Sequence, residues 1–153
     1  MKAVLLAGGA GTRLRPLTKL YNKHMLPVGD RPMIGHAIAK VKEAGIREVV
    51  LVTGRESAGS FIAYLGSGRE AGLSITYRIQ EEAGGIAEAL AQAEPAIDPD
   101  DKIVVLLGDN LFEEPLKPHI EAFEAQPEGA MVLLKRVDDP GRYGVPVFDG
   151  SGR

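Results

Sequence analysis

Apolar segments of strand length alternate along this chain with segments of helical spacing, and this alternation restricts the fold more than any other feature. Strands are predicted at Lys2–Ala7, Glu48–Thr53, Ser74–Ile79, Lys102–Leu107, Ala130–Val137 and Val145–Phe148. Helices are predicted at Pro32–Ala44, Ser57–Leu65, Ile86–Ala93 and Leu116–Ala125. Such an order predicts an α/β, doubly wound fold with a mostly parallel sheet and helices on both faces.

Two loops of this predicted fold carry the polar residues of most interest. The loop Gly8–Thr18 follows the first strand, and Gly108-Asp109-Asn110 follows the fourth. In open α/β sheets, ligands bind beyond the carboxyl ends of the strands. We therefore expect the two loops, distant in sequence, to lie on one rim and to form one site.

The charge distribution points to an anion at that rim. The first 29 residues contain five cations and no acid before Asp30; the cations are Lys2, Arg13, Arg15, Lys19 and Lys23. Residues 1–55 carry a formal charge of +7 and residues 56–153 carry −10, which gives the net −3. Glycines that admit backbone N–H groups, followed by cations, are typical of polyphosphate sites. A local anion site fits better than a nucleic-acid surface, and the alternative is a solvated basic segment.

Several classes of protein are excluded by what the sequence lacks. The glycine loop is neither GxxxxGK[ST] nor the dinucleotide fingerprint, because Leu14 occupies the third glycine position. The chain has no cysteine, so it has no disulfide or thiol nucleophile, which fits a reducing compartment. Its apolar runs are too short for a membrane span. We expect a cytoplasmic protein that binds neither nucleic acid nor membrane.

Four motifs in order resemble the sugar-1-phosphate nucleotidyltransferases. The first is Gly-Gly-x-Gly-Thr-Arg-Leu-x-Pro-x-Thr, which begins at Gly8 and continues into Asn22–Val28. The others are Tyr77–Gln80 with Gly84–Ala89, Leu106–Asn110, and Arg142–Val145. Within this family the likeness is strongest to the glucose-1-phosphate thymidylyltransferases. The resemblance implies a Rossmann-like nucleotidyltransferase fold.

The resemblance also implies a reaction. A sugar-1-phosphate oxygen attacks the α-phosphorus of a nucleoside triphosphate, dTTP or UTP, and pyrophosphate leaves. That oxygen is already anionic near neutral pH, so no protein nucleophile is needed, and cations with a divalent ion stabilise the added charge. The implied catalytic residues are Arg13 for the β- and γ-phosphates, Lys23 for the α-phosphate or sugar phosphate, and Asp109 as a ligand of the cofactor Mg²⁺. Without a metal, Asp109 would cap the next turn.

Base and sugar contacts follow from the same resemblance. Gln80 is expected to pair with a pyrimidine edge through its amide donor and acceptor, and the alternative is a surface glutamine. The other implied nucleotide-binding residues are Leu6, Ala7, Gly8, Gly9, Gly11, Thr12 and Gly85. Tyr143 and Gly144 would contact the hexose, unless Tyr143 is an ordinary packed aromatic residue. His24, His36 and His119 show no metal-ligand spacing and are expected to be structural.

The family's domain normally continues well past residue 153. We therefore expect residues 1–153 to be the nucleotide-binding part of a domain that is incomplete at its C-terminus. Turnover should then be low, and a bare strand edge should make the chain self-associate as a homo-oligomer. Two alternatives remain open: a non-catalytic module that binds a nucleotide or nucleotide sugar, and an enzyme of this family with another base or sugar 1-phosphate.

Overall fold

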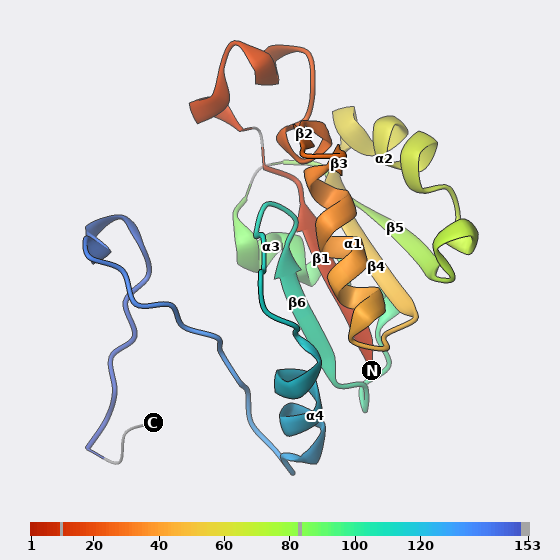
Figure 1. Cartoon of the computed structure of the whole chain (residues 1–153). Helices are drawn as coiled ribbons and strands as arrows, with labels where there is room; N and C mark the ends of the chain where they lie inside the picture. The colour runs from red at the N-terminus through yellow and green to blue at the C-terminus, as the bar shows by residue number, and fades with distance from the viewer. Residues whose placement is uncertain (10, 83, 151–153) are drawn as a thin grey trace.

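The computed structural model describes residues 1–9, 11–82 and 84–150, and its centre is a parallel sheet of four strands (Figure 1). The strands lie in the order β5-β4-β1-β6. Their bounds are β1 Lys2–Ala7, β4 Glu48–Gly54, β5 Ser74–Gln80 and β6 Ile103–Leu107. β1 pairs with β4 on one side, where Leu5 faces Leu51, and with β6 on the other, where Leu5 faces Leu106. The predicted α/β, parallel, doubly wound fold is confirmed.

Helices cover both faces of the sheet, as the sequence predicts. α1 (Met33–Glu43), α2 (Ala58–Leu65) and α4 (Lys117–Ala125) contribute Ile34, Phe61 and Ile120 to the core on one face. α3 (Ile86–Ala91) contributes Ala89 to the core on the other face. Successive strand side chains alternate between the two cores, so that Leu5 faces α1 and Leu6 faces α3. Because both faces are covered, β1 is apolar throughout its interior.

The segment predicted as one long loop, residues 8–30, contains short structured pieces. These are three 3-10 helices, η1 (Thr12–Leu14), η2 (Leu17–Lys19) and η3 (Lys23–Met25), and the first strand of a hairpin, β2 (Pro27–Val28) with β3 (Arg31–Pro32). The other 3-10 helices are η4 Arg55–Ser57, η5 Arg69–Ala71, η6 Glu94–Ala96 and η7 Pro140–Arg142. This excursion stands above the carboxyl end of β1 in Figure 1. The chain then returns to the sheet through α1.

Two lysines make ion pairs and hydrogen bonds at the edge of the sheet where the strands begin. Lys2 Nζ lies 3.1 Å from Asp98 Oδ2 and 2.9 Å from Asp101 Oδ2. Lys102 Nζ donates to the carbonyl oxygens of Phe123, Glu124 and Gln126 at 2.9, 2.7 and 2.6 Å, at the C-terminus of α4. Lys2, one of the five early cations, therefore does not contribute to an anion site at the carboxyl edge, because its ammonium lies at the other end of β1 and is paired with two carboxylates.

The predicted strands Ala130–Val137 and Val145–Phe148 are also wrong. Both segments are irregular, and the chain after α4 runs clear of the sheet (Figure 1, blue). Their apolar side chains stay exposed, with Val147 at 94%. Strand formation requires a neighbouring strand to complete the backbone hydrogen bonds, and neither segment has one in the described part of the chain. No helix among the described residues is long and apolar enough to span a membrane.

Candidate functional site

The candidate site lies at the carboxyl end of β1, where the order of the strands in the sheet changes direction. The chain passes from β1 to β4 on one side, and only later to β6 on the other. Such a switch in strand order opens a crevice at the carboxyl edge. The backbone N–H of Gly108 donates to the carbonyl of Leu6 at 2.9 Å, which brings the glycine loop and the loop after β6 side by side. The predicted common rim is confirmed.

Lys23 and Asp109 meet across this crevice. The ammonium of Lys23 donates a hydrogen bond to Oδ2 of Asp109, although 86 residues separate them. Lys23 also lies over the glycine loop, because a Cβ added to Gly9 would fall 3.6 Å from its Nζ. A Cβ at Gly11 would meet Lys23 Cβ at 2.9 Å, and the φ of Gly11 is +59°. Glycine is thus required at position 11 both by the close approach and by the left-handed backbone.

The pair is only partly shielded, with Lys23 and Asp109 side chains 22% and 33% exposed. Burial raises the pKa of the Asp109 carboxyl, but the hydrogen bond and positive charge of Lys23 outweigh this effect. The pKa of Asp109 therefore lies below its ordinary value. Asp109 is a carboxylate at neutral pH, and a single ammonium balances its charge.

His24 lies next to this pair, because it follows Lys23 on η3 and its ring packs against Gly108, which precedes Asp109. Asn22 caps η3, since its Oδ1 accepts from the backbone N–H of His24 at 2.9 Å and lies 2.7 Å from Nδ1 of the His24 ring. The ring is buried and lies 6.4 Å from the Phe61 ring, measured between centroids. Burial, and then the charge of Lys23, lower the pKa of His24 to about 4. The ring is a neutral packing element, as the sequence analysis expects for this histidine.

The remaining cations of the loop are exposed and available to a ligand. Arg13 lies on η1, between Thr12 and Leu14, and Arg15 and Lys19 follow it. No described side chain pairs with any of these three cations. Thr18 stabilises the loop, because its hydroxyl donates to the carbonyl of Gly11 at 2.7 Å. Arg13 is therefore an exposed cation of the loop, and its part in an anion site stays a prediction.

Gln80, the last residue of β5, lies against the start of the glycine loop. A Cβ at Gly8 would collide with Oε1 of Gln80, so only glycine fits there while that oxygen keeps its place. Gln80 Nε2 donates to the carbonyl of Gly85, 3.3 Å away, at the start of α3. The predicted base-contacting residues Gly8, Gln80 and Gly85 therefore form one group.

A cavity of about 190 Å³ opens beside this group. Its lining consists of Gly8, Gly9, Asn22, Gly54, Arg55, Glu56, Ser57, Gln80, Glu81 and Glu82. Three of these residues are glutamates, which would repel phosphates. Arg55 offsets one of these charges, so the lining is net negative and suits an uncharged group, whereas the exposed cations Arg13, Arg15 and Lys19 of the glycine loop suit an anion.

Other predicted contacts are placed differently. Leu6 and Ala7 are buried in β1, and the Leu6 carbonyl is already hydrogen-bonded to Gly108. Tyr143 and Gly144 lie on the segment that runs clear of the sheet, and Tyr143 is 65% exposed. The structure thus brings Lys23 to Asp109 and Gln80 to Gly8 and Gly85, but it does not bring the two predicted sugar residues to them.

The rim offers few side-chain donors to a metal ion. No group of three His, Asp or Glu side chains within residues 1–9, 11–82 and 84–150 could hold a metal ion. Mg²⁺ commonly takes one or two protein carboxylates and fills its other positions with phosphate oxygens and water. Asp109 supplies one such carboxylate beside a loop suited to phosphates, so the residues present fit a magnesium ion that arrives with a nucleotide.

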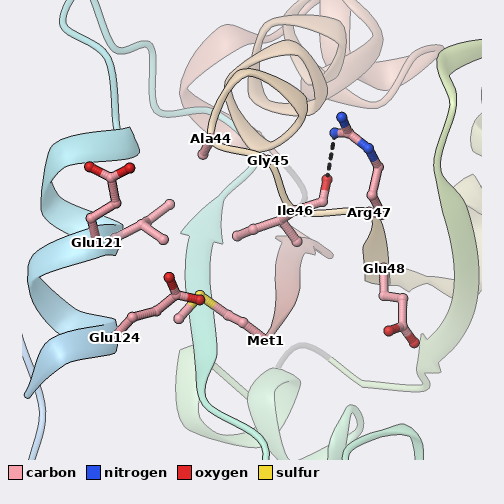
Figure 2. Close-up of a pocket in the computed structure, with 9 residues that line it drawn as sticks. Met1, Ala44, Gly45, Ile46, Arg47, Glu48, Glu121 and Glu124 are labelled. Carbon is pink, nitrogen blue, oxygen red and sulfur yellow. Dashed lines mark hydrogen bonds between the residues drawn. The ribbon is translucent and has the colours of Figure 1, made fainter.

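A larger cavity, of about 360 Å³, lies at the opposite edge of the sheet (Figure 2). Its floor includes Met1 and Ile46, and Glu121 and Glu124 of α4 stand at its side. Arg47 Nη1 donates to the Ile46 carbonyl at 3.4 Å. None of the predicted site residues lines this cavity.

Sequence reasoning missed two residues of the site. Glu88 on α3 accepts a hydrogen bond from Gln80 Nε2, and Asn22 Nδ2 donates to Ser57 Oγ at 3.0 Å on the wall of the smaller cavity. Both residues lie inside the motifs quoted above, and this position was the only indication in the sequence that they belong to the site. Their partners are 8 and 35 residues away, so local spacing could not assign their roles.

A parallel sheet with a glycine loop, an ordered lysine and a carboxylate at its switch point is typical of nucleotide-binding α/β proteins. The chain belongs to the nucleotidyl transferase family, whose sequence model matches residues 2–153.

Individual proteins and solved structures that are similar to this chain carry names that fit this family. The glucose-1-phosphate thymidylyltransferase of Neisseria meningitidis is 38% identical over 100% of this chain and 53% of its own length. A crystal structure from Bacillus anthracis, of a protein assigned as a glucose-1-phosphate thymidylyltransferase, superimposes with a TM-score of 0.93 at 50% identity, covering 98% of this chain and 61% of its own. The crystal structure of a UDP-glucose pyrophosphorylase complexed with UDP-glucose superimposes with a TM-score of 0.65 at 30% identity. The match covers 81% of this chain and 53% of the pyrophosphorylase chain. The chain spans about half the length of the curated thymidylyltransferases it matches.

Proposed function

We propose that this chain binds a pyrimidine nucleoside triphosphate with Mg²⁺ and takes part in nucleotidyl transfer to a sugar 1-phosphate. The preferred substrates are dTTP and glucose 1-phosphate, and the products are dTDP-glucose and pyrophosphate. The observation that carries this proposal is the contact of Lys23 with both the glycine loop and Asp109. The names of the thymidylyltransferase relatives support the choice of substrates.

In the proposed reaction, a phosphate oxygen of glucose 1-phosphate forms a bond to the α-phosphorus of dTTP. The bond between that phosphorus and the bridging oxygen to the β-phosphorus breaks, and pyrophosphate leaves with the electron pair. Lys23 would neutralise the α-phosphate, and Arg13 would bind the departing pyrophosphate through its planar fork. The N–H groups of the loop from Gly8 to Thr12 would hold the phosphates in line.

Asp109 would hold Mg²⁺, which supplies positive charge to the triphosphate oxygens. Before a nucleotide arrives, Lys23 occupies the Asp109 carboxylate. Binding would then separate the pair, with Lys23 turning to phosphate and Asp109 to the metal. A cytoplasmic location, a homo-oligomeric state and a contact of Tyr143 and Gly144 with the hexose stay predictions.

The proposal is tested in two stages with the same purified chain. Calorimetric titration with dTTP in magnesium measures binding, and release of pyrophosphate and dTDP-glucose from dTTP and glucose 1-phosphate measures transfer. Arg13→Ala should weaken dTTP binding by about 1.5–3 kcal/mol, the scale of a charged hydrogen bond. Lys42→Ala is the matched control, because Lys42 is exposed near the C-terminus of α1, away from the rim.

The outcomes separate the candidate functions. Binding with no transfer would favour the non-catalytic nucleotide module. Binding and transfer with UTP in preference to dTTP would favour another base, a possibility that the similarity to UDP-glucose pyrophosphorylase keeps open. No binding of any triphosphate, or equal affinity in Arg13→Ala and wild type, would contradict the proposed site.

A further inference from the structure

The amide of Gln80 lies in a short chain of hydrogen bonds that sequence reasoning did not foresee. Gln80 is buried, with 6% of its surface exposed. Its Nε2 donates to a carboxylate oxygen of Glu88 and to the carbonyl of Gly85. The other carboxylate oxygen of Glu88 accepts from Gln92 Nε2 at 2.8 Å. Both oxygens of Glu88 are therefore engaged by side-chain amides.

These partners decide which way the Gln80 amide points. The two ends of a carboxamide have nearly the same shape, so the orientation depends on what each end meets. A carboxylate and a carbonyl can only accept hydrogen bonds. The NH₂ group of Gln80 must therefore face Glu88 and Gly85, which leaves Oε1 on the side of Gly8.

Glu88 is itself held in place. It is half-buried on α3, and a Cβ at Gly84 would meet Glu88 Cγ at 3.0 Å and its Oε2 at 3.3 Å. Gly84 thus packs against the Glu88 side chain on one side, and Gln92 holds its Oε1 on the other. A carboxylate confined in this way can orient a neighbouring amide.

The outward oxygen of Gln80 is the free end of this chain of hydrogen bonds. None of the described groups donates a hydrogen bond to Oε1, and this oxygen lies against Gly8. Gln80 lines the 190 Å³ cavity together with Gly8 and Gly9. A base in that cavity would meet a hydrogen-bond acceptor, while both amide hydrogens are engaged elsewhere.

We propose that Glu88 is a positioning residue that presents the carbonyl oxygen of Gln80 to the base, so that the site selects bases with an N–H at that point. The inference rests on the proposed nucleotide-binding function. Uracil and thymine carry a hydrogen on N3, whereas N3 of cytosine is an acceptor that would face the Gln80 oxygen. The predicted paired contact of Gln80, donor with acceptor, is replaced by a single accepting contact.

The test measures the ratio of UTP to CTP affinity by calorimetry in magnesium. The two ligands share the ribose and triphosphate, so the ratio reports only the base. Wild type should favour UTP by about tenfold or more. UTP donates a hydrogen bond to Gln80 Oε1, whereas CTP places an acceptor opposite that oxygen, and the difference is worth about this much. In Glu88→Met only the long 3.3 Å bond to the Gly85 carbonyl still orients the amide, so the reversed orientation becomes populated and the ratio should fall to within about threefold.

Two variants control for structure and charge. Glu88→Gln should keep the wild-type ratio, because its oxygen still accepts from Gln80 while Gln92 can reverse its own amide. Glu94→Met removes an exposed acid just beyond α3 and should also keep the ratio. Thermal unfolding of each variant checks the fold, and Glu88→Ala replaces Glu88→Met if the latter does not fold.

Each other outcome counts against the inference. An unchanged ratio in Glu88→Met, or a uniform loss of both affinities, would make Glu88 a merely structural residue. Equal affinities of wild type for UTP and CTP would overturn the orientation argument while leaving the proposed function intact. A wild type that binds neither nucleotide would overturn the proposed function and this inference with it.

Discussion

The buried ring of His24 should make the stability of this protein depend on pH between neutrality and about pH 5. The ring is 2% exposed, and Nδ1 donates to Asn22 Oδ1, so an added proton would have to be placed on Nε2 inside the core. Its pKa falls from 6.5 to about 4 on folding. The unfolded chain therefore binds the proton more readily than the folded chain.

The sign and size follow from this difference. Because the folded pKa is the lower one, the stabilisation is complete above pH 6.5 and is lost as the pH falls towards 4. For these two pKa values, the free energy of unfolding should drop by about 2 kcal/mol at pH 5 and about 3 kcal/mol at pH 4. The lowered carboxyl pKa values, including that of Asp109, lie below 3.8, so the range from pH 6.5 to 5 isolates His24.

Urea unfolding followed by circular dichroism at several pH values from 7.5 to 5, at fixed ionic strength, measures this free energy. His24→Gln should flatten the profile in that range, because the titrating group is gone. His119→Gln is the matched control, since His119 lies exposed on α4, and it should keep the wild-type slope. A flat wild-type profile, or a slope that survives in His24→Gln, would refute the reasoning.

Two further substitutions test other contacts. Gly8→Ala should weaken UTP binding about fivefold with little change in stability, because the new Cβ displaces Gln80 Oε1 and costs a hydrogen bond of about 1 kcal/mol; unchanged affinity on calorimetric titration would remove that oxygen from the site. Lys102→Met should lower the free energy of unfolding by about 1–3 kcal/mol, because three carbonyl oxygens at the end of α4 lose their donor. Nucleotide affinity should stay constant in Lys102→Met, and a large change there would mean that the two edges of the sheet are coupled.

The local order of elements was predictable because it depends on neighbours in the sequence. Apolar runs and helical spacing identified the four strands of the parallel sheet and the helices α1 to α4 to within one or two residues at each end, but not the short hairpin of β2 and β3. The shared rim followed as well, since parallel strands place their carboxyl ends together, and it brought Lys23 to Asp109. Motif order and strand order were thus enough to predict that Lys23 and Asp109 share one edge of the sheet.

Tertiary structure decided everything that depends on a partner far away in the chain. Lys2 is one of five early cations, yet Asp98 and Asp101 bind it at the wrong edge for the site. Residues 130–137 have the apolar content of a strand, but a strand exists only where another supplies hydrogen bonds. Composition also cannot orient the amide of Gln80. Its direction comes from Glu88 and Gly85, because a carboxamide presents whichever end its acceptors leave free.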